Sequence, residues 1–270
     1  MIGDTIAKLR KESHLTQEEL AAKLGVSFQA VSEWERNVST PSLEHLQHLA
    51  RQFHLSTDAL LSREQHTWDT RDRLFDEEHM YTYIKAKAQM LGLSQTLQAL
   101  PFARSRHAGQ YRKGSGRIPY IIHPLTMACH ALAMGLDEDD VIAALLLHDV
   151  IEDTDTQPEE LPVSERVRNA VCLVSYNTYP GPKRDILDLY YQHIRENPLA
   201  CLIKCIDRCN NLSGMAAAFS RKRMASYVLE TEKEIIPLLS VIKGVPEWNS
   251  AAWLLKYQLL SLLETFKCFL

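Results

Sequence analysis

Apolar residues recur every three to four positions along most of the chain, which is the spacing of one face of an α-helix. Within the first 62 residues this pattern breaks into short segments, at roughly 3–13, 17–24, 28–36 and 42–53, with a last one around Leu60. Thr16 and Glu19 have the spacing of a capping box at a helix start, and Gly25 allows the positive φ of a tight turn after a helix. The pattern therefore predicts five short helices in this part of the chain.

Beyond residue 62 the pattern changes twice. Residues 63–80 are dense in charge and poor in aliphatic side chains, which predicts a linker that is at most partly helical. Helical spacing resumes at Tyr81 and continues to the end, interrupted by a Gly-rich loop at 113–119 and a Pro-rich loop at 177–183. Strand-type alternation is weak throughout. We therefore predict an all-α protein with a five-helix domain at 1–62, a linker at 63–80 and a larger helical domain at 81–270.

Composition narrows the class of protein. The 270 residues carry a formal net charge of −4, so the chain as a whole is not a general nucleic-acid binder. The N-terminus has no secretory signal pattern, and no stretch approaches the roughly 20 apolar residues of a membrane helix. The six cysteines form no CxxC pair. These features favour a soluble, reduced, cytoplasmic protein with no membrane association.

Three cysteines, at positions 201, 205 and 209, recur every four residues. This stripe allows two interpretations, a metal site or the apolar face of a buried helix. Free cysteine behaves as a small hydrophobic residue, and a period of four is the spacing of one helix face. We therefore favour the buried helix.

The segment from Leu15 to Ser27, followed by Val31 to Arg36, resembles the Cro/cI-type (Xre) helix-turn-helix family, and the likeness covers residues 1–62. The resemblance implies that the third helix enters the major groove of double-stranded DNA. Gln29 is suited to bidentate bonding with adenine, and Gln17 to a phosphate at a helix N-terminus. The side chains expected at DNA are Gln17, Phe28, Gln29 and Ser32.

The charge of this module opposes strong DNA binding. Residues 1–62 contain six Lys and Arg against eight Asp and Glu, a net charge of −2. Phosphate contacts usually dominate DNA affinity, so an acidic module begins at a disadvantage. The alternative is a helical module for protein contacts or dimerisation. DNA binding remains the favoured interpretation, because the local placement of charge matters more than its sum.

The strongest chemical pattern lies between Ala143 and Thr154, where an apolar run delivers His148 and Asp149, followed one helical turn later by Glu152 and Asp153. Burying several unpaired polar groups is costly, and a metal ion offsets that cost. His123 and Asp207 lie in two further apolar segments. The mixed set of imidazole and carboxylate groups suits manganese, iron or zinc.

These residues resemble the HD superfamily and, more narrowly, the alarmone hydrolase domain of RelA/SpoT proteins, over about 103–237. The motifs that carry the resemblance are the segments 107–113, 115–116, 119–124, 148–154 and 207–211. The resemblance implies an Mn²⁺ ion, with Fe²⁺ and Zn²⁺ as alternatives, held by His123, His148, Asp149 and Asp207. It also implies that Glu152 and Asp153 handle the attacking water.

The implied reaction removes the 3′-pyrophosphate from a guanosine tetra- or pentaphosphate. The residues expected at the substrate are Arg112, Lys113, Lys183, Asn211 and Tyr227. The chain departs from the family at the loop after Lys113, at segment 174–179, and at Asn210, where the family has His. These departures leave the metal ligands intact and concern the base and the leaving group.

Two alternatives stay open. The HD domain of a transcriptional regulator could sense a nucleotide without turnover, or the enzyme could act on another nucleotide, such as NADPH or a nucleoside monophosphate. The retention of both Glu152 and Asp153 favours an enzyme. A homodimer is expected because helix-turn-helix modules bind paired half-sites. The apolar-rich segment 248–270 allows dimerisation, but covering the core of its own domain is the favoured role.

Overall fold

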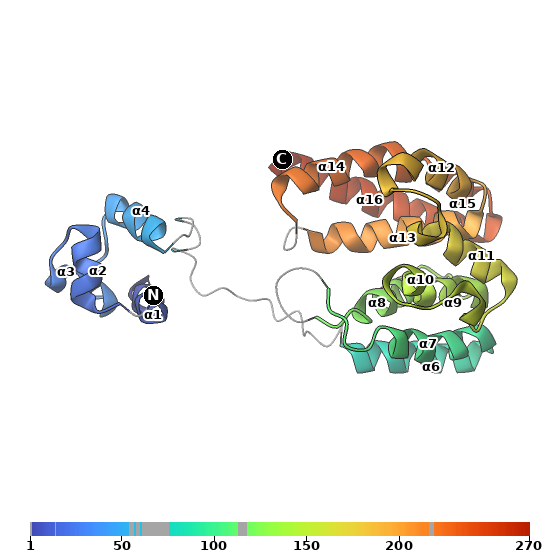
Figure 1. Ribbon diagram of the computed structural model, residues 1–270, viewed down its shortest axis with the longest axis horizontal. Coiled ribbons are helices and arrows are strands. Elements are labelled where there is room, and N and C mark those ends of the chain that lie inside the picture. The colour runs from blue at the N-terminus through green and yellow to red at the C-terminus, as the bar shows by residue number, and fades with distance from the viewer. Residues whose placement is uncertain are drawn as a thin grey trace. The chain divides into compact units, whose positions relative to one another are not determined.

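The computed structural model describes residues 2–13, 15–53, 57, 60, 76–112, 118–215 and 219–270, without the side chains of Glu12, Lys183 and Arg184. The chain divides into two units, residues 1–72 and 73–270 (Figure 1). Each unit has its own hydrophobic core and is described by itself.

The described helices of the first unit are α1 (Ile2–Glu12), α2 (Gln17–Leu24), α3 (Phe28–Glu35) and α4 (Leu43–Gln52). The capping box is confirmed, because the Thr16 hydroxyl accepts from the Glu19 N–H while the Glu19 carboxylate accepts from the Thr16 N–H. Gly25 ends α2 with φ of 69°. The fifth predicted helix falls almost entirely outside the described residues, although Leu60 is buried in the core of this unit.

That core lies where the four helices meet. Ile6, Leu20, Val31 and Leu49 are fully buried, one from each helix. Trp34 packs on the same core and places its ring 5.3 Å from that of His45. The core residues therefore fix α3 against the other helices, while Phe28 and Gln29 in its first turn are exposed.

The second unit begins with α6 (Glu77–Leu91), which starts inside the predicted linker because Asp76 caps it by accepting from the His79 N–H. The longer helices that follow are α7 (Ser94–Arg106), α8 (Ile122–Ala133), α9 (Asp139–Leu147), α11 (Glu165–Val174), α12 (Lys183–Arg195), α13 (Pro198–Gly214), α14 (Arg221–Glu230) and α16 (Asn249–Phe269). Shorter elements are α10 (Val150–Asp153), η2 (Pro158–Glu160), η3 (Tyr176–Thr178), η5 (Thr231–Ile235), α15 (Leu238–Lys243) and η6 (Pro246–Trp248). Extended pairing in the described part of the chain is limited to one bridge between Tyr111 and Pro119, so the all-α prediction is confirmed.

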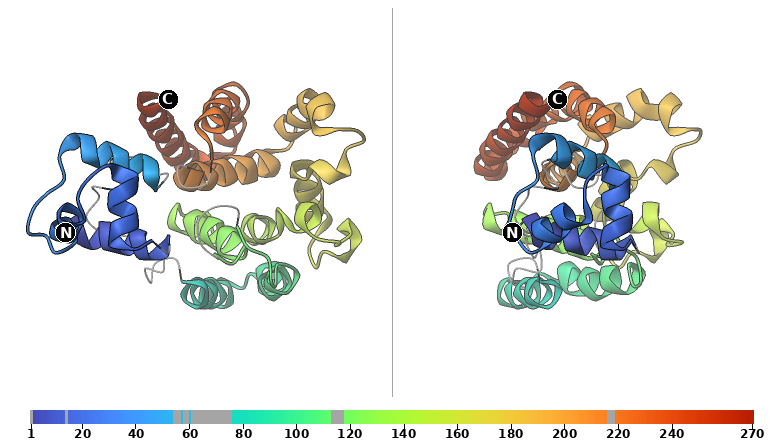
Figure 2. Two further views of the ribbon diagram at one scale, coloured as in Figure 1. Left: turned by 60° about the vertical axis from the view of Figure 1, so that its left-hand side comes forward. Right: turned by 90° about the vertical axis from the view of Figure 1, so that its left-hand side faces the viewer.

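The helices of this unit stack in layers (Figures 1 and 2). Helices α6 and α7 form one outer layer, α8 and α9 lie next to them, α13 follows, and α14 and α16 form the other outer layer. Residues 141–147 of α9 are fully buried, as expected for a helix that is apolar on all sides. The three cysteines of α13 are buried in the same core, which confirms the interpretation of that stripe as a helix face. No helix in the described ranges is long and apolar enough to cross a bilayer.

One local prediction is wrong. The apolar run and the acidic pair do not form one continuous helix, because α9 ends at Leu147 and α10 begins at Val150. His148 and Asp149 form a turn between the two helices, and Asp149 has φ of −100° and ψ of −6°. The sequence on both sides has helical character, so the break comes from tertiary packing, because α9 packs against both α8 and α13. The turn places both side chains beside α8 and α13.

Candidate metal centre

Three predicted ligands converge in the second unit. His123 comes from the first turn of α8, and His148 and Asp149 come from the turn between α9 and α10. One ligand atom from each lies within 4.8 Å of the others. The Asp149 carboxylate oxygen Oδ2 is 2.9 Å from His148 Nε2 and 3.6 Å from His123 Nε2. The two histidines are almost completely buried, whereas Asp149 is partly exposed.

Both imidazole rings are oriented by a hydrogen bond on the far nitrogen. His148 Nδ1 lies 2.9 Å from the carbonyl oxygen of Leu145, and His123 Nδ1 lies 2.6 Å from the side-chain oxygen of Asn210. An acceptor at Nδ1 holds a proton there, so Nε2 is the nitrogen that binds a metal once it has given up any proton of its own. His148 Nε2 is buried and, within the described part of the chain, lacks an aligned hydrogen-bond partner. This donor set fits a divalent transition metal.

The fourth predicted ligand, Asp207, adjoins the cluster from α13. Its Oδ1 lies 3.2 Å from His123 Nε2, while its Oδ2 lies 3.2 Å from the ammonium of Lys204. Asn211 donates to the same Oδ1 from one turn further along α13, at 2.5 Å. Asp207 therefore contacts the cluster through His123, and Lys204 and Asn211 set the orientation of its carboxylate.

The charges of these groups shift one another's pKa values. Burial lowers the pKa of His148, but the neighbouring Asp149 carboxylate outweighs it and raises that pKa to about 9. Burial raises the pKa of Asp149, yet His148 and His123 hold it below its usual range. The same holds for Asp207, where Lys204 and His123 overcome burial and hold the pKa well below normal. Both carboxylates are therefore anionic at neutral pH and available to a cation.

Several supporting residues were missed in the sequence. The Tyr120 hydroxyl donates to Asp149 Oδ2 at 2.6 Å, and burial followed by the charges of Asp149 and Asp153 raises its pKa far above normal. Lys204 and Asn210 were not predicted in these supporting roles. Each lies three residues from Asp207, so helical spacing on α13 was a usable signal. Tyr120 lies three residues before His123 in the same motif.

The predicted catalytic pair lies on α10, next to the ligand turn. Glu152 is half-buried, and its Oε2 accepts a hydrogen bond from the backbone N–H of Tyr176 at 3.1 Å. The Asn177 amide donates to the Glu152 carbonyl at 2.9 Å. Asp153 is exposed, and its carbonyl accepts from Gln110 at 2.8 Å. The segment that departs from the family, 174–179, therefore supports Glu152 directly.

The predicted substrate residues divide into three groups. Arg112 donates to the Asn211 side-chain oxygen at 2.8 Å, and Asn211 in turn contacts Asp207, so both lie beside the metal ligands. Tyr227 lies on α14, with its ring 3.8 Å from the Arg208 guanidinium, which follows Asp207 in α13. The third group is the two lysines, for which the structure describes no side chain. Lys183 is the first residue of α12, and Lys113 lies outside the described residues.

The predicted DNA contacts lie on α2 and α3 of the first unit. Phe28 and Gln29 are exposed in the first turn of α3, and Ser32 is half-buried one turn later. The Gln17 amide donates to the Glu35 carboxylate at 2.7 Å, which also binds Arg10. Gln17 is thus half-buried, and one of its amide protons is bonded to Glu35.

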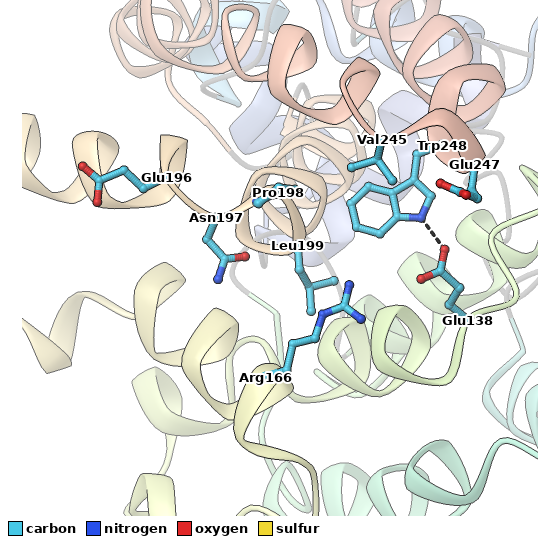
Figure 3. A pocket seen from close by; sticks show the side chains of 9 residues that line it. All are labelled: Glu138, Arg166, Glu196, Asn197, Pro198, Leu199, Val245, Glu247 and Trp248. Carbon is cyan, nitrogen blue, oxygen red and sulfur yellow. Dashed lines mark hydrogen bonds between the residues drawn. The ribbon is translucent and has the colours of Figure 1, made fainter.

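A separate cavity of about 410 Å³ lies between α11, the start of α13 and η6 (Figure 3). Figure 3 shows Trp248 donating from its indole nitrogen to the neighbouring Glu138 on one side of this cavity, with Arg166 and Asn197 also lining it. None of the predicted site residues lines it. This cavity is therefore separate from the cluster around His123 and His148.

Comparison with known protein families finds a matching family for each of the two units. A helix-turn-helix family model matches residues 6–60, and an HD-domain model matches residues 99–174. A solved structure of a metazoan ortholog of SpoT that hydrolyses ppGpp aligns with a TM-score of 0.52 and 22% identity, over 64% of this chain and 95% of that one. This likeness confirms the HD-type fold.

Three relatives illustrate the sequence similarity. The guanosine-3′,5′-bis(diphosphate) 3′-pyrophosphohydrolase MESH1 of Xenopus tropicalis is 34% identical over 163 residues, which is 57% of this chain and 86% of the relative. Human MESH1 is 36% identical, over 44% of this chain and 68% of its own length. The guanosine-3′,5′-bis(diphosphate) 3′-pyrophosphohydrolase of Aquifex aeolicus is 36% identical over 52% of this chain but only 20% of its own length.

The chain thus pairs a helix-turn-helix unit with an HD domain, as the two motifs predicted. More particularly, it belongs to the same family of HD-domain proteins as the MESH1 enzymes.

Proposed function

We propose that the protein is a metal-dependent guanosine-3′,5′-bis(diphosphate) 3′-pyrophosphohydrolase of the cytoplasm, joined to a DNA-binding module. The observation that carries this proposal is the convergence of the ligand atoms of His123, His148 and Asp149, with Asp207 adjoining them. Relatives that align over most of their own length carry this activity in their names, which supports the choice of substrate.

The metal would be held by His123, His148, Asp149 and Asp207, and Mn²⁺ is the proposed ion, with Fe²⁺ and Zn²⁺ as alternatives. When bound, such an ion lowers the pKa of a coordinated water toward neutrality. Asn210 and the carbonyl of Leu145 keep the Nε2 atoms of both histidines available. Tyr120 keeps the Asp149 carboxylate facing the same site.

Glu152 accepts the proton of the attacking water, and Asp153 supports this step from the same turn of α10. The reaction adds water across the bond between the 3′ oxygen and the pyrophosphate, so that ppGpp gives GDP and pyrophosphate. Arg112 and Asn211 bind the substrate beside Asp207, while Lys113, Lys183 and Tyr227 contribute to the binding of its base, ribose and phosphates. Positively charged groups are suited to this role because the substrate carries several phosphate charges.

The test is pyrophosphate release from ppGpp by full-length protein that has been stripped of metal and reloaded with Mn²⁺. We expect metal-dependent release of GDP and pyrophosphate, with much slower turnover of NADPH and nucleoside monophosphates measured in parallel. Faster turnover of one of those nucleotides would show that the protein is an enzyme but that its substrate is not ppGpp. Tight binding of ppGpp without product would instead indicate a nucleotide-sensing regulator.

The first unit is proposed to bind double-stranded DNA as part of a homodimer. Support comes from the helix-turn-helix match at residues 6–60 and from the exposed first turn of α3. Phe28, Gln29 and Ser32 are the proposed base contacts. Gln17 is proposed to meet a phosphate with the amide hydrogen that Glu35 does not use.

Replacing Gln29 with alanine is expected to weaken binding to a specific DNA site by about 1–3 kcal/mol, the usual value of a bidentate base contact. Binding to unrelated DNA should stay the same, because Gln29 contacts no phosphate in this arrangement. The site would first be selected from random DNA with the full-length protein, and affinity then measured by fluorescence anisotropy. Equal losses on specific and unrelated DNA would contradict the assignment of Gln29 to a base.

A further inference from the structure

The C-terminal helix α16 carries an apolar surface that its own unit does not cover. Its inward face buries Leu255, Leu259 and Leu263 in the core. On the opposite face the side chains of Trp253 and Tyr257 are 66% and 62% exposed, and Leu260 is 39% exposed. Large apolar side chains that lie next to one another and are exposed mark interaction sites in otherwise well-packed proteins.

The exposed positions follow the spacing of a helix–helix seam. Trp253, Tyr257, Leu260 and Glu264 are separated by four, three and four residues, which is the repeat of the contact positions in a coiled coil. The rings of Trp253 and Tyr257 are parallel, with 5.9 Å between their centroids and 2° between their planes. The two rings therefore stack on each other and form one exposed aromatic cluster that a second helix can cover.

The charges beside this seam favour a second copy of the same helix in antiparallel orientation. Lys256 and Glu264 are both exposed, Lys256 between Trp253 and Tyr257 and Glu264 one turn beyond Leu260, where it also contacts Lys267 of its own helix. Pairing about a point between Tyr257 and Leu260 brings Lys256 of each copy within about one helical turn of Glu264 in the other. A parallel pairing would place like charges side by side, so the surface is self-complementary only in the antiparallel arrangement.

We propose that this face of α16 is the surface through which two copies of the chain associate. Tyr257 of each copy packs on Leu260 of the other, and Trp253 covers the aliphatic part of the opposite Glu264. The inference rests on the homodimer proposed above and names its interface; it is independent of the hydrolase site. Burial of aromatic side chains at the centre of such an interface supplies most of its affinity.

Sedimentation velocity of the full-length protein over a range of concentrations tests the proposal. We expect a dimer whose dissociation constant rises about 30-fold or more in Leu260→Asp, as for a central interface residue. Lys256→Glu and Glu264→Lys should each weaken the dimer about fivefold, and the double variant should restore it, since exposed ion pairs contribute up to about 1 kcal/mol. All these side chains are exposed, so circular dichroism should show unchanged folding.

Two outcomes would overturn the proposal. A dimer that is unaffected by Leu260→Asp has its interface elsewhere. A monomeric wild type would mean that the face does not pair two copies of the chain. Iodide quenching of tryptophan fluorescence in wild type and in Trp253→Phe would then show whether another part of the chain covers Trp253. Pyrophosphate release by the same samples is a separate measurement, so a failure of the hydrolase proposal is recognised independently.

Discussion

Asp149→Ala is expected to reduce metal-dependent hydrolysis by well over 100-fold and to weaken Mn²⁺ binding in parallel. Asp149 Oδ2 is the point on which His148, His123 and the Tyr120 hydroxyl converge. Loss of a supporting partner of a metal ligand typically costs 10–100-fold, so loss of the ligand itself should cost more. Metal content after reloading and titration calorimetry with Mn²⁺ measure the first effect, and pyrophosphate release measures the second.

Tyr120→Phe is a milder variant for comparison with Asp149→Ala. It removes the hydrogen bond to Asp149 and leaves every proposed ligand in place. Mn²⁺ affinity should therefore fall in the order wild type, Tyr120→Phe, Asp149→Ala, with a 10–100-fold loss for the middle variant. An Asp149→Ala protein that binds Mn²⁺ and hydrolyses ppGpp like the wild type would remove Asp149 from the centre.

The local part of this fold could be predicted because its signals are local. Thr16, Glu19 and Gly25 define both ends of α2 by contacts within a few residues, and the structure shows each of them. The break at His148 was missed for the opposite reason. The sequence on both sides has helical character, and only the packing of α8 and α13 around the turn decides where the helix stops.

The candidate site shows the same division. His123, His148 and Asp149 stand in short motifs and converge in the structure. The contact between Glu152 and segment 174–179 joins residues 24 and 25 positions apart, and it depends on how α11 leads the chain back to α10. A backbone N–H donor leaves no trace in the sequence, because every residue except proline provides one. Contacts of this kind become visible only in the folded structure.

Glu152→Ala is expected to lower kcat by about 10²–10⁴-fold while Mn²⁺ binding stays close to that of the wild type, because this is the usual contribution of a positioned general base. The carboxylate lies on α10, outside the group of three ligand atoms that defines the metal centre. A separation of catalysis from metal binding is therefore the signature that distinguishes Glu152 from Asp149. Pyrophosphate release under saturating substrate, together with metal content, provides both measurements.

Asn177→Ala provides a graded variant of the same experiment. Asn177 is exposed and donates to the carbonyl of Glu152, so its loss leaves the catalytic carboxylate present but less well held. We expect a fall in kcat of about tenfold, the equivalent of one hydrogen bond of about 1–1.5 kcal/mol, with KM nearly unchanged. Thr178→Ala is the control, since the Thr178 hydroxyl, among the contacts described, bonds to the carbonyls of Cys172 and Ser175 and not to α10. If Glu152→Ala also lost its metal, or if Thr178→Ala lowered kcat as much as Asn177→Ala, the loss would come from a general disturbance of α10 rather than from the base.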